Sequence, residues 1–262
     1  MTRRFTRAGA SVLALFLVLG ATGCNQLKAR DQLNKGIQSY KGARFNEAIE
    51  HFKKAIELDP KLLNARLYLA TAYANQFMPG VDSPENIRTG KQAISEFERV
   101  LESDPRNTNS IAGIANIYLN MSNFDEAKKW YKKQIEADPS NPEAYYSVGV
   151  ITWKETYQPR MKIRAEKNLR PEDPIKDDKV REEMCARHNP IIEEGFTMLN
   201  KAIALRRDYD DAMAYMNLMY REKADCQTAD VRAESLQKAD EWVQKAMAIR
   251  KKRAEGAAAA SK

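Results

Sequence analysis

Cysteine and histidine are the residues of this chain best suited to metal or nucleophilic chemistry, and there are few of them. The 262 residues contain three cysteines, Cys24, Cys185 and Cys226, and two histidines, His51 and His188. Cys185 and His188 are one helical turn apart, a spacing that can present two ligands to one metal ion, but no cluster of further ligands lies nearby in the sequence. We therefore expect no metal site.

Signatures of enzymatic chemistry are missing from the sequence as well. It contains no glycine-rich phosphate loop, no nucleophile elbow and no HExxH pair. Met213, Met216 and Met219 follow a helical spacing and are predicted to pack in a core rather than to hold a cofactor. The sequence predicts a binding protein that has neither catalytic residues nor a cofactor.

The first 24 residues have the features of an export signal. Arg3, Arg4 and Arg7 precede 16 uncharged residues, a run that is shorter than the ~20 residues of a membrane-spanning helix and is typical of a cleaved export signal. The following Ala21-Thr22-Gly23-Cys24 resembles a bacterial lipobox. That resemblance implies a signal peptide over 1–23, a lipid on Cys24 and a place on the periplasmic side of the cell envelope, with the outer membrane favoured. A plain secretory signal is the alternative.

Net charge argues against nucleic acid as a partner. The chain carries a formal charge of +7, which becomes +4 once the three arginines of the signal are removed. Nucleic-acid-binding domains concentrate basic residues on one face, whereas this excess is small and dispersed. We expect no nucleic-acid partner.

A repeated amphipathic segment organises the rest of the chain. FNEAIEHFKKAIELDP at 45–60 is followed by similar segments at 95–105, 123–139, 193–205 and 239–249. Three of the segments are closed by Pro60, Pro105 and Pro139, and the last two of these prolines are 34 residues apart. Self-similarity at such a period is the signature of a helical repeat protein.

The residues of the repeat identify its kind. The first copy contains, in order, Gly36, Tyr40, Phe45, Ala48, Phe52, Ala55 and Pro60. This pattern and the 34-residue period resemble the tetratricopeptide repeat (TPR). The resemblance implies an all-α, right-handed superhelix, a solenoid of about five helix pairs over 24–252, with repeats at about 29–62, 63–107, 108–141, 142–209 and 210–252. Residues 253–262 are predicted to be a disordered tail.

Small and helix-breaking residues explain the pattern physically. Gly36 and Ala48 are placed where the two helices of a repeat cross, and Phe52 faces the next pair. Asp59-Pro60 stops a helix because the residue before proline is forced out of the α region. Asn141-Pro142 and Asn189-Pro190 are predicted to start helices, with asparagine as the N-cap and proline at the first position.

Three insertions interrupt the period at 76–88, 155–190 and 223–235, each between the first helix (A) and the second helix (B) of its repeat. We expect them to emerge on one edge. The largest, 155–190, is predicted to be an irregular loop with Pro159, Pro171 and Pro174, followed by a helix over about 178–188. Its basic residues suggest either a solvated loop or a contact with anionic lipid or an acidic partner; these residues are Arg160, Lys162, Arg164, Lys167 and Arg170.

Cys185 and Cys226 fall in the insertions of adjacent repeats. In an oxidising compartment they form a candidate disulfide, although sequence spacing does not fix the Cα separation that a disulfide needs. The pairing is therefore left open.

The resemblance also implies a concave groove, lined by A helices, that holds an extended peptide or a partner helix. The candidate partner-binding residues at these positions are Tyr40, Asn75, Asn109, Asn116, Asn120, Tyr146, Trp153 and Lys154. Asparagine offers both donors and an acceptor to a peptide backbone, and the aromatic residues offer contact area with a polar handle. The alternative is that the asparagines are simply soluble surface.

Together these features predict a membrane-anchored periplasmic scaffold that binds a protein or peptide partner. Two alternatives are open. In layout the chain is similar to outer-membrane assembly lipoproteins and to type IV pilus pilotins, which combine a lipobox with tetratricopeptide repeats, so it could be a dedicated assembly factor. Otherwise the insert at 155–190 could carry a ligand or enzymatic site.

Overall fold

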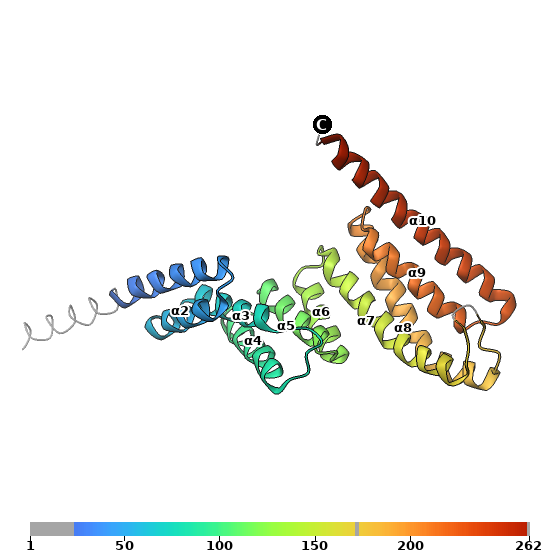
Figure 1. Cartoon of the computed structure of the whole chain (residues 1–262), viewed down its shortest axis with the longest axis horizontal. Coiled ribbons are helices and arrows are strands. Elements are labelled where there is room, and N and C mark those ends of the chain that lie inside the picture. The colour runs from blue at the N-terminus through green and yellow to red at the C-terminus, as the bar shows by residue number, and fades with distance from the viewer. Residues whose placement is uncertain (1–23, 171–172, 261–262) are drawn as a thin grey trace, which may run out of the picture. The chain divides into compact units, whose positions relative to one another are not determined.

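The computed structural model describes residues 24–170 and 173–260, and the described residues form ten helices and no strand (Figure 1). The first helix covers 24–41. It is followed by α2 (Phe45–Leu58), α3 (Leu63–Gln76), α4 (Pro84–Ser103), α5 (Thr108–Asn120), α6 (Phe124–Ala137), α7 (Pro142–Glu166), α8 (Asp178–Leu205), α9 (Asp210–Asp225) and α10 (Ala229–Ala260). In chain order these helices make the five expected pairs. The predicted signal peptide lies outside the described residues.

Helix ends fall where the sequence predicts them in the regular repeats. Asp59, Asp104 and Asp138, each followed by proline, are the C-caps of α2, α4 and α6. Asn141 is the N-cap of α7 and its side chain accepts a hydrogen bond from the amide of Glu143. These local signals are confirmed.

The chain divides into two compact units, one up to Met121 and one from Ser122 onward. The boundary lies between α5 and α6, inside the third repeat. We refer to them as the N-terminal unit and the C-terminal unit and describe each by itself.

The N-terminal unit is held together by close approach at small residues. A Cβ on Gly36 would lie 2.4 Å from the ring of Phe52, so only glycine allows the first helix this close to α2. The fully buried Phe52 also stacks on Tyr68 of α3, with ring centroids 5.6 Å apart. Phe52 therefore joins one repeat to the next, as predicted.

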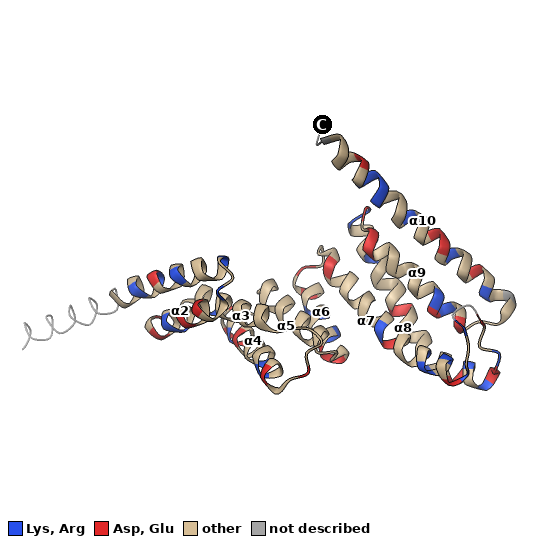
Figure 2. Ribbon diagram, in the orientation of Figure 1, with Lys and Arg blue, Asp and Glu red and all other residues tan. Residues whose placement is uncertain are grey.

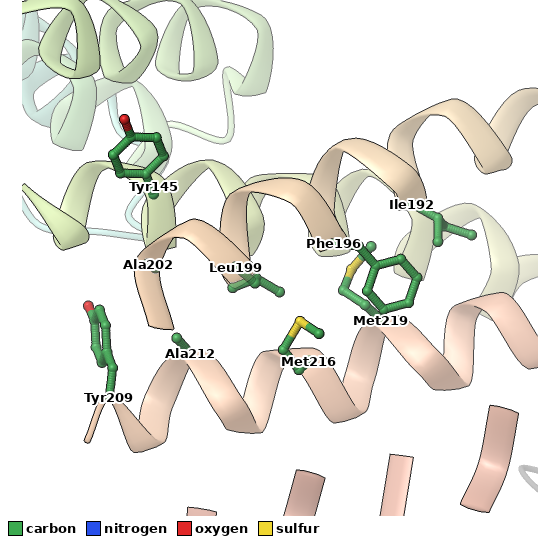
Figure 3. Close-up of a cluster of buried hydrophobic side chains, with 9 residues drawn as sticks. All are labelled: Tyr145, Ile192, Phe196, Leu199, Ala202, Tyr209, Ala212, Met216 and Met219. Atoms are coloured by element: carbon green, nitrogen blue, oxygen red, sulfur yellow. The ribbon is translucent and has the colours of Figure 1, made fainter. Parts of the chain in front are cut away.

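The C-terminal unit has its core between α7, α8 and α9. Figure 3 shows Phe196 and Leu199 of α8 facing Met216 and Met219 of α9. Both methionines are almost fully buried, which confirms their predicted role in packing. Gly195 allows the close approach, since a Cβ there would lie 2.5 Å from Met219.

The 155–190 insert differs from the prediction of an irregular loop. It consists mainly of two helical extensions, because α7 continues through Pro159 to Glu166 and α8 begins at Asp178. Asn189-Pro190 was predicted to start a helix, which is wrong: both residues lie inside α8. Pro159 and Pro190 are exposed, and buried polar side chains on the opposite faces of these helices, described below, hold the extensions in place.

The C-terminal tail also differs, because α10 continues to Ala260 where disorder was predicted. Residues 251–259 are exposed, so tertiary packing does not impose this helix. The run of alanines at 257–260 has the highest helix propensity of any residue type and accounts for the extension. No helix in the described part of the chain has an apolar stretch long enough to cross a bilayer.

Candidate functional site

A groove of about 630 Å³ lies between α3 and α5 of the N-terminal unit. We call it the asparagine groove. It is lined by Asn64, Leu67, Tyr68, Thr71, Ala74, Phe77, Phe97, Asn109, Ala112, Gly113, Asn116, Ile117 and Asn120. Both A helices of the second and third repeats contribute to it, as the predicted concave surface requires.

The apolar part of the groove depends on one glycine. A Cβ on Gly113 would lie 2.5 Å from the ring of Phe97, so the missing side chain allows this phenylalanine of α4 to reach the groove. Phe97 itself is only 3% exposed, and Phe77 is similarly buried. The aromatic rings thus form a fixed apolar wall rather than mobile side chains.

The polar part of the groove consists of amides. Asn109, Asn116 and Asn120 lie along one face of α5 and are exposed, and Asn64 of α3 is exposed as well. Thr71 is half-buried, and its hydroxyl donates to the carbonyl of Leu67 in its own helix. Primary amides carry both donors and an acceptor, which suits a ligand with backbone N–H and C=O groups.

No charged residue lines the asparagine groove among the residues that the structure describes. Figure 2 shows α5 without a single charged residue along its length. A charged ligand would therefore lose water at this surface without gaining a partner of opposite sign. The groove favours an uncharged, extended segment with apolar side chains.

Two predicted residues of the N-terminal unit lie outside the groove lining. The amide of Asn75 donates to the hydroxyl of Tyr40, 2.7 Å away, and to the carbonyl of Thr71. The ring of Tyr40 contacts Phe45 and Tyr68. Asn75 and Tyr40 therefore connect the first helix to α3, so their polar groups are engaged within the protein.

The other predicted residues belong to the C-terminal unit, where aromatic side chains contact one another between α7 and α9. Tyr146 and Trp153 of α7 lie against Tyr215 of α9, with centroid distances of 5.6 and 5.5 Å. Tyr157 and Tyr209 extend this aromatic cluster at its two ends. Burial raises the pKa of Tyr146, so its phenol is neutral near pH 7. Tyr209 is buried, the other four rings are half-buried, and each ring contacts at least one other ring of the cluster.

Lys154 is half-exposed on α7 and makes no ion pair with any residue in the described part of the chain. Cys24 is exposed at the first described residue. The structure thus brings three of the eight predicted groove residues together, Asn109, Asn116 and Asn120.

A group of buried charges forms a second notable site, which the sequence did not indicate. The group, which we call the ionic cluster, consists of Arg160, Arg164, Glu222, Asp225 and Arg232. Asp225 lies 2.9 Å from Arg160 and 2.8 Å from Arg164, and Glu222 lies 2.9 Å from Arg160. Arg164 is only 1% exposed and also donates to the carbonyls of Arg170 and Asp173.

The ionic cluster corrects the interpretation of the basic run. Arg160 and Arg164 were expected in a solvated loop or at a contact with lipid or an acidic partner, but both are committed to Asp225. Arg160 also forms an ion pair with Glu222, whose side chain is only 1% exposed. Burial therefore raises the pKa of Glu222 to about 7, against the attraction of Arg160.

Metal ligands do not assemble in the described part of the chain, where no three side chains of histidine, cysteine, aspartate or glutamate could hold a metal ion together. His188 is buried, and this burial together with nearby arginines lowers its pKa.

Several groove residues were missed by sequence reasoning. Asn64 and Tyr68 lie seven and three positions before Thr71 on the same face of α3, so the helical period indicates that the three residues line one surface. Phe97 comes from a B helix and reaches the groove only because position 113 is glycine. The repeat pattern does not show that these two positions, on different helices, meet.

Comparison with known proteins agrees with the fold. Two tetratricopeptide-repeat family models match residues 32–62 and 90–148. No curated protein matches the sequence. The structure resembles that of MamA, with a TM-score of 0.59, 14% identity and coverage of 87% of this chain and 94% of the other.

Two further solved structures show the same likeness. MamA from Desulfovibrio magneticus RS-1, from residue 41 to its end, has a TM-score of 0.58 at 15% identity over 86% of this chain and 96% of that one. YrrB, described as a TPR protein with an unusual peptide-binding site, has a TM-score of 0.53 at 14% identity over 84% of this chain and 90% of its own. The chain is a tetratricopeptide-repeat protein, and its fold is the all-α TPR superhelix.

Proposed function

We propose that this protein is a membrane-anchored scaffold that binds an extended, uncharged segment of a partner protein in the asparagine groove. Binding of protein or peptide partners is the usual activity of tetratricopeptide-repeat proteins, and YrrB is described as having a peptide-binding site. The observation that carries the proposal is the groove itself, in which exposed amides lie beside an apolar wall and no charge is present. This combination satisfies a peptide backbone while it buries apolar side chains.

A selection experiment tests the binding proposal. Peptides selected from a random display library on the purified chain should be rich in uncharged residues, and their affinity should fall at least tenfold for the double variant Asn116→Ala/Asn120→Ala. A matched control is Lys54→Ala, since Lys54 is exposed on α2 outside the groove. Equal affinities for the double variant and the wild type would contradict the proposal.

The same site can be tested in cells. A photo-reactive amino acid at position 116 should crosslink a partner, whereas the same group at position 54 should not. If the crosslinked partner belongs to a barrel-assembly or pilus machine, the assembly-factor role becomes the more specific description of the scaffold. Crosslinking from position 54 alone would place the binding surface on the outer helices instead.

The proposed anchor is a lipid on Cys24, supported by the lipobox-like Ala21-Thr22-Gly23-Cys24 and by the preceding apolar run. Several acyl chains would give stable attachment, since each buried CH₂ contributes ~0.8 kcal/mol. Cells fed an alkyne-tagged fatty acid should label the wild type and not Cys24→Ser. Labelling of both proteins, or of neither, would contradict the anchor without bearing on the groove. With this anchor, the proposed location is the periplasmic side of a bacterial envelope membrane, with the outer membrane favoured.

A further inference from the structure

The helical insert of the C-terminal unit has a small apolar core of its own. Ile175, Met184 and Cys185 are buried together, and Cys226 packs against them from the end of α9. Two insertions of the sequence, 155–190 and 223–235, thus meet at this point. The only thiols among the residues from Ser122 onward lie at their junction.

The two thiols contact each other directly. Cys226 packs against the buried group that contains Cys185, and the two thiols are side-chain hydrogen-bonding partners. Cys185 is 7% exposed on α8, whereas Cys226, the C-cap of α9, is half-buried. By residue exposure, Cys185 is therefore the more buried of the two cysteines.

Electrostatics distinguish the two sulfurs. The hydrogen bond with Cys226, together with the nearby guanidinium of Arg181, lowers the pKa of Cys185. The same hydrogen bond and burial raise the pKa of Cys226, with Asp225 and Glu222 acting in the same direction. When the pair loses one proton, the thiolate therefore forms on Cys185 in preference to Cys226.

The surrounding ionic cluster keeps the two cysteines in place without a covalent bond. Asp225 precedes Cys226 and is held by Arg160 and Arg164 of α7. Arg164 also binds the carbonyls of Arg170 and Asp173, in the segment that leads to α8. Contacts other than a bond between the sulfurs therefore hold the backbone next to Cys226 and the segment that leads to α8.

We propose that Cys185 and Cys226 form a reversible disulfide that fastens the helical insert to the end of α9. The inference does not depend on the groove or on the anchor, because it concerns residues of the C-terminal unit alone. It makes this junction a modification site whose state follows the thiol–disulfide balance of its surroundings.

The chemistry is two successive exchanges with an external disulfide, such as oxidised glutathione or an oxidised dithiol protein. A thiolate of the pair attacks one sulfur of that disulfide, breaks its S–S bond and releases one thiolate. The second cysteine loses its proton, attacks the mixed disulfide and releases the other thiolate. In total, two thiols are oxidised to one disulfide, the external disulfide is reduced to two thiols, and both protons pass to the released thiolates.

Peptide mapping of the full chain tests the bond itself. The background is Cys24→Ser, so that no other thiol takes part. After equilibration in glutathione buffers of increasing oxidised fraction and alkylation of free thiols, mass spectrometry should find a Cys185–Cys226 crosslinked peptide in the monomer. Two glutathione adducts on one chain, crosslinks between chains, or free thiols in the most oxidising buffer would each overturn the proposal.

Thermal unfolding provides an independent measurement. The bond closes a loop between positions 185 and 226, so the oxidised chain should unfold about 5–15 °C higher than the reduced chain when tryptophan fluorescence is followed. All three tryptophans, Trp130, Trp153 and Trp242, belong to the C-terminal unit. Cys185→Ser, in the same background, should unfold at one temperature in both buffers. An equal difference in that variant would show that the shift arises elsewhere and would contradict the proposal.

Discussion

The asparagine groove and the aromatic cluster occupy the same positions of the repeat in the two units, yet one is open and the other is filled. Thirty-four residues, one full period, separate Ala112 from Tyr146 and Asn116 from Val150. In α5 the small Ala112 lines a groove of about 630 Å³. In α7 the ring of Tyr146 lies on Tyr215 and Tyr209 instead.

The polar residues at corresponding positions of α5 and α7 also differ between an open surface and internal contacts. Asn109 and Asn120 line the groove. One period later, the position of Asn109 is taken by Glu143, which bonds to Arg206 and to the hydroxyl of Tyr209. The position of Asn120 is taken by Lys154. The C-terminal unit further buries the ionic cluster, for which the N-terminal unit has no counterpart among the described residues. The third repeat, which has no insertion, contributes α5 to an open groove, whereas α7 of the interrupted fourth repeat uses the corresponding side chains for internal contacts.

The largest expected effect lies in the ionic cluster. Arg164→Met removes a buried cation and leaves Asp225 and two carbonyls with fewer partners, which should lower the free energy of unfolding by about 3–4 kcal/mol. Denaturant titration followed by tryptophan fluorescence measures this in the C-terminal unit. Lys162→Met, an exposed position of the same helix, is the matched control. A loss equal to that of the control would mean that the cluster does not hold the insert.

Glu222 should make the free energy of unfolding of the C-terminal unit depend on pH. Its pKa rises from 4.5 to about 7 on folding, so the folded chain binds this proton more tightly than the unfolded chain. Stability from this group is fully present below pH 4.5 and is lost as the pH rises to about 7, by up to about 3 kcal/mol.

The variant Glu222→Gln isolates this contribution, because His188 acts in the opposite direction: its pKa is lowered, so it reduces stability as the pH falls below 6.5. Urea titrations from pH 4.5 to pH 8 should show a smaller decline in the free energy of unfolding for Glu222→Gln than for the wild type. Identical profiles would contradict the assignment.

The aromatic cluster should make a smaller contribution. Tyr146→Ala removes a half-buried ring from two aromatic contacts and should cost about 2 kcal/mol in the C-terminal unit, below the range for a fully buried ring. The same measurement on Tyr157→Ala, at the end of the cluster, should give a smaller loss. If Tyr146→Ala left stability unchanged while it abolished peptide binding, Tyr146 would be a binding residue after all.

Much of the fold was predictable because the regular repeats encode it locally. Asp59-Pro60 ends a helix through local backbone geometry, and Asn141-Pro142 starts one through a side-chain cap followed by proline. Gly36 opposite Phe52 follows from the repeat. The insert was not predictable in the same way. Pro159 and Pro190 are helix breakers by local rules, whereas the ion pair between the buried Arg164 and Asp225 joins α7 to a residue 61 positions away, which local rules do not include.

The candidate site was predictable to a similar degree. The resemblance to the tetratricopeptide repeat placed Asn109, Asn116 and Asn120 on the concave side of their helix, and the structure brings them together in the groove. It could not separate Asn75, which bonds to Tyr40, from the lining residues, because that bond joins positions 35 residues apart. Whether a concave surface is open or filled depends on the size of the side chains at corresponding positions, as Ala112 and Tyr146 show.

The most direct test of the account is therefore the affinity of Ala112→Tyr for a peptide selected on the wild type. Ala112 is half-exposed at the groove, so a tyrosine should fill the space as Tyr146 does one period later, with little change in stability. The account predicts at least a tenfold loss of affinity, about 1.4 kcal/mol, together with an unchanged circular dichroism spectrum. Unchanged affinity in a folded Ala112→Tyr protein would show that the groove between α3 and α5 is not the binding site.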